Sequence, residues 1–86
     1  MKKLEALEAA ISAVEKRGES YGDVLENHKR IASLWSVVLG QRVTPEQVVL
    51  CMTCVKVARL METPDHEDSW VDIDGYGACG AEIADG

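Results

Sequence analysis

Apolar residues recur every three or four positions along this chain, which is the spacing of one face of an α-helix. Near the start, this pattern predicts a helix from about Lys2 to Lys16 with a narrow seam like that of a coiled coil. The seam residues are Leu4, Leu7, Ile11 and Val14. Gly18 follows two cationic residues and predicts the end of this helix.

A second helix is predicted to begin near Asp23 and to end at Gly40. Asp23 and Glu26 form a variant of the capping box, in which each side chain binds a backbone N–H of the first turn. Its apolar stripe consists of Val24, Ile31, Trp35 and Val38, flanked by Leu34 and Leu39.

The third helix has the clearest start signal. Thr44 stands at the N-cap, Pro45 at the first helical position and Gln47 at the third. The helix then runs to about Glu62 and is apolar around most of its circumference. We therefore expect it to be the central and most buried helix.

Thr63-Pro64 interrupts the pattern, and a fourth helix is predicted from Asp65 or His66 to about Ala84. No internal repeat and no strand-like alternation is visible. The expected fold is all-α, a compact bundle of about four helices in one domain over residues 1–86.

A chain of 86 residues buries only about 60–65% of its unfolded surface, so we expect a homo-oligomer that adds buried area. The three cysteines are odd in number, no signal-peptide pattern is present, and no apolar run approaches a membrane span. These features predict a cytoplasmic protein with no membrane partner. Cys51 and Cys54 lie within the apolar third helix, so we interpret them as buried free thiols rather than a zinc or redox motif.

The formal net charge is −6 and the isoelectric point is near 4.7, which argues against duplex nucleic acid as a partner. A small phosphorylated ligand remains compatible with this charge, because it requires only two or three well-placed cations.

Lys56 and Arg59 are three residues apart and share one stripe of the third helix. They could bind a phosphate or carboxylate group, or they could pair with Asp68 and Asp72 across the helix hairpin. Asp68 and Asp72 are four residues apart on one face, a spacing that could hold Mg²⁺ with ligand phosphates. Asp68 could instead help to cap the fourth helix.

Other polar and aromatic residues are expected at the mouths of the helices. Asn27 could read a base edge or a hydroxyl group, and His28 could act as a base or a ligand; alternatively, both could form hydrogen bonds between helices. Tyr21 precedes the positive end of the second helix and could stack on a base. The expected ligand-binding set is Tyr21, Asn27, His28, Trp35, Lys56, Arg59, Asp68, Asp72 and Tyr76.

Two groups of these residues resemble a family of small phage and prophage proteins of unknown function. The first group is Arg17-Gly18-Glu19-Ser20-Tyr21-Gly22, Asn27, Ile31-Ala32 and Leu34-Trp35. The second group is Lys56, Ala58-Arg59-Leu60, His66, Asp68-Ser69, Asp72 and Gly75-Tyr76. This resemblance implies a phage-encoded protein that acts in the cytoplasm of an infected bacterial host.

More distantly, the chain is similar to the all-α nucleoside triphosphate pyrophosphohydrolases of the MazG type. Those enzymes hold Mg²⁺ with two pairs of carboxylates, typically one pair on each of two helices. This chain departs from that pattern, because Lys56 and Arg59 stand where the second carboxylate pair is expected.

Three functions follow from these observations. The first is a non-enzymatic binder of a small nucleotide, which sequesters an immune signal such as a cyclic oligonucleotide or an ADP-ribose derivative and needs no cofactor. The second is a Mg²⁺-dependent nucleotide pyrophosphohydrolase, with Asp68 and Asp72 on the metal. The third is a non-catalytic interaction protein whose polar residues only bond neighbouring helices.

Overall fold

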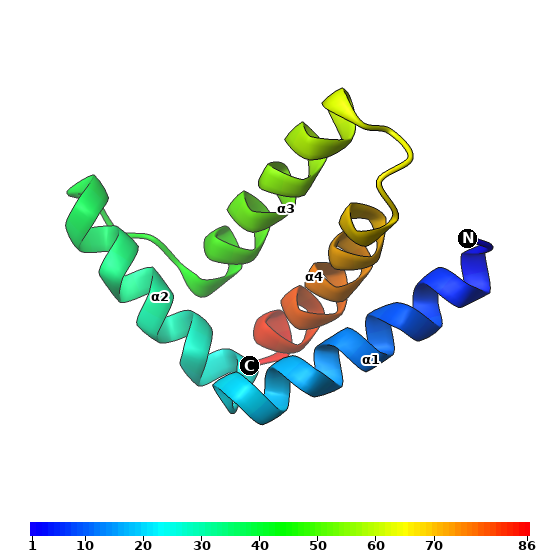
Figure 1. The fold of residues 1–86 in the computed structure, drawn as a ribbon. Helices are drawn as coiled ribbons and strands as arrows, with labels where there is room; N and C mark the ends of the chain where they lie inside the picture. The colour runs from blue at the N-terminus through cyan, green and yellow to red at the C-terminus, as the bar shows by residue number, and fades with distance from the viewer.

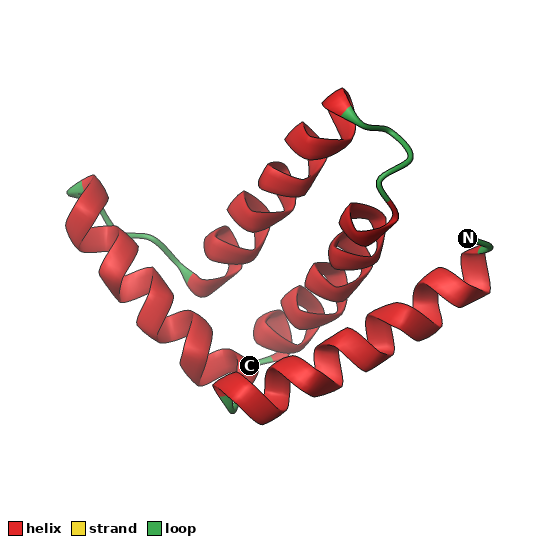
Figure 2. Cartoon of the chain, viewed as in Figure 1, coloured by secondary structure: helices red, strands yellow, loops and turns green.

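The computed structural model describes residues 1–86 and consists of four α-helices joined by short loops (Figures 1 and 2). The helices are α1 (Lys3–Tyr21), α2 (Val24–Leu39), α3 (Pro45–Glu62) and α4 (Glu67–Asp85). The predicted all-α class and number of helices are therefore confirmed.

The central helix is α4, which lies between α3 and α1 and also contacts α2 (Figure 1). The prediction that α3 would be the most buried helix was wrong. Only Val48, Val49 and Leu60 of α3 are buried, whereas α4 buries five residues. The strong apolar character of α3 misled the prediction, because burial depends on how many neighbours surround a helix: α4 contacts all three other helices, whereas α3 contacts only α2 and α4.

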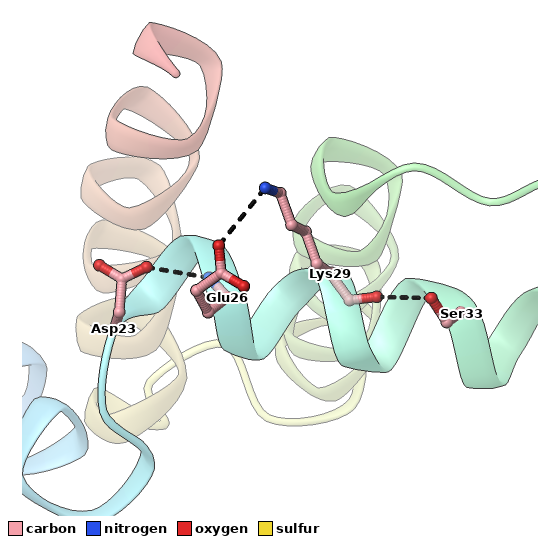
Figure 3. Close-up of polar contacts among 4 residues, drawn as sticks. All are labelled: Asp23, Glu26, Lys29 and Ser33. Carbon is pink, nitrogen blue, oxygen red and sulfur yellow. Dashed lines mark hydrogen bonds and ion pairs between the residues drawn. The ribbon is translucent and has the colours of Figure 1, made fainter.

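The capping box predicted for α3 is confirmed, whereas that predicted for α2 is confirmed only for Asp23, because the Glu26 side chain pairs with Lys29 at 3.4 Å instead. The Thr44 hydroxyl accepts the Gln47 N–H at 3.2 Å, and the Gln47 side chain accepts the Thr44 N–H at 2.9 Å. In α2, one Asp23 carboxylate oxygen accepts the Glu26 N–H at 3.0 Å (Figure 3). These bonds satisfy backbone N–H groups that have no partner within the helix.

The first helix does not end at Gly18 as predicted, but continues to Tyr21. The turn falls at Gly22, whose φ of 76° is in the region that favours glycine, and its N–H donates to the Gly18 carbonyl at 2.9 Å. This extension adds one helical turn, which carries Arg17 and Tyr21 along the side of α4.

The predicted seam of α1, apart from Val14, does not face the other helices. Leu4, Leu7 and Ile11 are 65%, 51% and 60% exposed, whereas Ala10 is buried and Val14 is half-buried. Small alanine side chains therefore form the side of α1 that packs on α4, where they permit close approach. The larger aliphatic residues are left without a partner within the chain.

Two further expectations concern exposure. Cys51 and Cys54 are exposed thiols, so the prediction that they are buried was wrong. None of the four helices combines the length and apolar composition that a bilayer span requires.

Candidate functional site

The largest cavity lies where the end of α1, the start of α2 and the C-terminal half of α4 meet. Its volume is about 440 Å³, within the range usual for small-molecule sites. Three residues of the expected ligand-binding set line it together: Tyr21, Asn27 and His28. Residues of α4 complete the wall, namely Ala78, Cys79 and Glu82.

Arg17 is the central cation of this cavity, and the expected set did not include it. Its guanidinium carbon lies 5.6 Å from the centre of the Tyr21 ring and 5.8 Å from that of the Tyr76 ring. These distances are those of cation–π attraction, which favours one orientation of the side chain. No carboxylate lies within ion-pair distance of Arg17. Its charge is therefore not neutralised by the protein.

The spacing of Arg17 and Tyr21 could have revealed this arrangement. Residues four positions apart lie on the same side of a helix, so one turn separates the cation from its aromatic neighbour. The erroneous helix end at Gly18 concealed this relation, because it placed Tyr21 in a loop.

A smaller cavity of about 120 Å³ adjoins the first and shares Val14, Arg17, His28 and Cys79 with it. Asp72 and Tyr76 line this second cavity. The structure thus gathers five residues of the expected set around Arg17: Tyr21, Asn27, His28, Asp72 and Tyr76.

The two polar residues of α2 differ in their bonding. The Nδ1 atom of His28 lies 2.8 Å from the Val24 carbonyl, which can only accept, so Nδ1 carries the proton. This bond is within the helix and not between helices, and it leaves Nε2 of a neutral ring as an acceptor. Asn27 is half-buried and lines the large cavity. Its backbone N–H is hydrogen-bonded, but its side-chain amide forms no hydrogen bond with another residue.

Lys56 and Asp72 form an ion pair of 3.0 Å between α3 and α4, with side chains 28% and 31% exposed. The pairing alternative is therefore confirmed for these two residues. Lys56 neutralises Asp72, so neither side chain presents an uncompensated charge to a ligand.

Replacing Lys56 by methionine is expected to lower the free energy of unfolding by about 1 kcal/mol, because the apolar stem is kept and a partly exposed ion pair is lost. Urea unfolding of the variant would measure this effect. Lys29→Met is the matched control, since its pair with Glu26 lies within one helix and both side chains are more than half exposed. A larger loss in the control than in Lys56→Met would contradict the assignment.

Arg59 does not join this site. Its Nη2 atom donates to Nε2 of His66 at 3.3 Å, and Nδ1–H of His66 then donates to Oγ of the buried Ser69 at 2.8 Å. Arg59 thus helps to close the turn between α3 and α4. Lys56 and Arg59 share a stripe of α3, but they lie one turn apart. Lys56 therefore meets Asp72 of α4, whereas Arg59 meets His66 in the turn before α4.

Asp68 and Trp35 also lie outside the site. Asp68 is exposed in the first turn of α4 and lines none of the cavities described. Trp35 lines a separate cavity of about 230 Å³ between α2 and the start of α3. No three His, Cys, Asp or Glu side chains converge as potential metal ligands. The structure thus does not bring Asp68 and Asp72 together with a third carboxylate.

The charges around the large cavity are mixed. Arg17, Asp23 and Glu82 line the same cavity, but neither carboxylate lies within ion-pair distance of Arg17, and Asp23 already accepts the N–H of Glu26. Burial raises the pKa of the Cys79 thiol above its ordinary value, although the Arg17 cation opposes this rise. The thiol is therefore protonated at neutral pH and is a poor nucleophile. The cavity can bind one anionic group at Arg17 and hydroxyl groups at the carboxylates, but it contains no activated nucleophile.

Comparisons with known proteins match nearly the whole chain. Residues 5–84 match the family model described as a domain of unknown function, DUF6378. The Gene 55 protein of Mycobacterium phage L5 is 48% identical over 62 residues, which is 71% of this chain and 40% of that protein. The Gene 55 protein of Mycobacterium phage D29 is 38% identical over 64 residues, or 74% of this chain and 42% of that protein. The chain thus spans less than half the length of these relatives. No solved structure matches.

Proposed function

We propose a ligand-binding function for this chain, which belongs to the DUF6378 family of phage proteins of unknown function. The ligand is a small nucleotide, and the protein sequesters it without turnover. In a phage-infected cell, such binding lowers the free concentration of a nucleotide immune signal, such as a cyclic oligonucleotide or an ADP-ribose derivative.

The observation that carries this proposal is the unpaired Arg17 guanidinium, which two tyrosine rings flank at a cavity of about 440 Å³. An arginine without a carboxylate partner is suited to a phosphate group, which it binds through two N–H donors. Tyr21 is 56% exposed, so its ring is accessible for stacking on a base.

The remaining polar groups suit the other parts of a nucleotide. The unbonded Asn27 amide offers both a donor and an acceptor, as recognition of a base edge requires. The Glu82 carboxylate can accept hydrogen bonds from ribose hydroxyl groups. A single cation among two carboxylates favours a ligand with one phosphate at this site over a triphosphate.

Arg17→Ala is expected to weaken binding by about 10- to 100-fold, because hydrogen bonds to a charged group contribute about 1.5–3 kcal/mol. Isothermal titration calorimetry would measure this with AMP, ADP-ribose and cyclic di-GMP as probes. Arg30→Ala is the matched control, since Arg30 is an exposed arginine of α2 outside the cavities described, and its affinity should equal that of the wild type.

Two results would overturn the proposal. One is an affinity for these probes that is undetectable in the wild type or unchanged in Arg17→Ala. The other is conversion of a bound probe: chromatography of the ligand after incubation with Mg²⁺ should recover it intact, and a hydrolysis product would identify an enzyme instead.

A further inference from the structure

The folded chain exposes more surface than a compact protein of its size. Its accessible surface is 6159 Å², against about 5,000 Å² expected for a compact monomer of 9.4 kDa. Its radius of gyration is 13.5 Å, against about 12 Å expected for 86 residues. The chain therefore has an excess of about 1,100 Å², which exceeds the roughly 800 Å² that each partner buries in a standard interface.

Part of this excess is an apolar stripe along α3, which we call the α3 stripe. It consists of Leu50, Cys54, Val57 and Met61. These residues are spaced four, three and four apart, which is the spacing of a helix that packs against another helix. Leu50, Val57 and Met61 are 63%, 47% and 81% exposed, and Cys54 is exposed as well. The other helices therefore leave about half or more of each of these three aliphatic side chains uncovered.

A second stripe of the same kind runs along α1. Leu4, Leu7 and Ile11 are each more than half exposed and are spaced three and four apart. Neither stripe contains a charged residue, although the chain as a whole is strongly acidic. Rows of large aliphatic side chains at this spacing are unfavourable in water, because each apolar Å² left exposed costs about 25 cal/mol.

The two stripes lie on the same side of the molecule. Leu50 of the α3 stripe directly follows Val49, which packs on Tyr76 of α4, and Ile11 of the α1 stripe directly follows the buried Ala10. Because successive residues of an α-helix are rotated by about 100°, each stripe is turned in the same sense from the side that packs on α4. The helix α1 runs parallel to α4 and α3 runs antiparallel to it, and the two flank α4 on opposite sides (Figure 1). The helix α3 thus differs from α1 both in its direction and in the side of α4 on which it lies. The two differences cancel, so both stripes lie on one common face of the molecule.

We propose that this face binds a second copy of the same chain, with the α3 stripe at the interface. A layer of helices needs a second layer to bury its apolar side, and a second copy provides an identical one. In a two-fold dimer the same patch is used by both partners, so an uncharged, self-complementary stripe meets its equivalent without a buried charge. The excess surface is sufficient for an interface of standard size.

Val57→Glu tests this proposal, because it places a charge in the α3 stripe. The substituted position is already half exposed in the single chain. Light scattering coupled to size-exclusion chromatography should give the wild type twice the chain mass of 9.4 kDa and Val57→Glu the mass of one chain. Val55→Glu is the matched control, since Val55 is 56% exposed on the other side of the same helix, and its mass should equal that of the wild type. Circular dichroism would verify that both variants remain helical.

A second measurement does not depend on any substitution of an apolar residue. Cys51 and Cys54 are both exposed in the single chain, but only Cys54 belongs to the α3 stripe. In the dimer, Cys54 should react with a maleimide at least about tenfold more slowly than Cys51, and dilution should remove the difference. A monomeric wild type, a mass that Val57→Glu leaves unchanged, or equal labelling of both thiols would overturn the proposal.

Discussion

Replacing Tyr76 by alanine is expected to destabilise the protein by about 3–5 kcal/mol, as for other large-to-small substitutions of buried aromatic residues. Tyr76 is only 7% exposed and belongs to a core cluster with Val49 and Ile83. Removing the ring leaves a void beside Arg17, and the few buried residues of this chain cannot collapse to fill it. Since small domains have a total stability of about 5 kcal/mol or slightly more, much of the variant should be unfolded at 25 °C.

Tyr76→Phe separates the ring from its hydroxyl. The Tyr76 hydroxyl forms no hydrogen bond with the protein, and no buried side-chain N or O atom lacks a partner. The hydroxyl is therefore not buried, and its removal costs no internal hydrogen bond. The phenylalanine variant should therefore unfold at nearly the urea concentration of the wild type. A loss in Tyr76→Phe as large as that in Tyr76→Ala would contradict the assignment of Tyr76 to the core through its ring.

Replacing Gly75 by leucine is expected to destabilise the protein by about 1–3 kcal/mol, because extra side-chain atoms would force two packed helices apart. Gly75 is buried, and a Cβ added there would lie 3.6 Å from Cγ2 of Val14 on α1. That distance is ordinary contact, so Gly75→Ala should be tolerated or stabilising by up to about 1 kcal/mol through its better helix propensity. Leucine adds further carbon atoms beyond this Cβ, beside the Val14 side chain. Thermal unfolding of both variants would measure these effects.

Gly77→Leu is the control for this pair. Gly77 lies on the same helix, is exposed, and has no atom within 4 Å of an added Cβ. Leucine there should raise the stability slightly through helix propensity alone. If Gly77→Leu were as destabilising as Gly75→Leu, the effect would belong to the helix itself and not to the contact with α1.

Local sequence signals identified much of the helical framework correctly. The Thr44 and Gln47 capping box and the Asp23 cap act through bonds within four residues, so the sequence contains all the groups involved. Gly18 shows the limit of such signals. A glycine disfavours a helix by about 1 kcal/mol, which packing of the adjacent turn on α4 can offset.

The candidate site was predicted in part. Tyr21, Asn27 and His28 lie close together because they flank one turn between two helices, and the sequence already places them within eight residues. Arg59, Asp68 and Trp35 were expected at the same site but lie elsewhere. Shared helix faces indicate a direction, but the distance to a partner along a second helix depends on how the two helices cross.

The sequence by itself determined where helices begin and which residues share a face. Tertiary structure decided which apolar face is covered. Alanines of α1 pack on α4 while Leu4, Leu7 and Ile11 remain exposed, because close packing of helices favours small residues over a more hydrophobic seam. It also decided that Arg17, and not Lys56, is the free cation of the site. Lys56 reaches Asp72 across a helix pair, whereas Arg17 meets two aromatic rings. The sequence allowed both cations to bind a ligand, and only the packing of the helices decided which of them is paired.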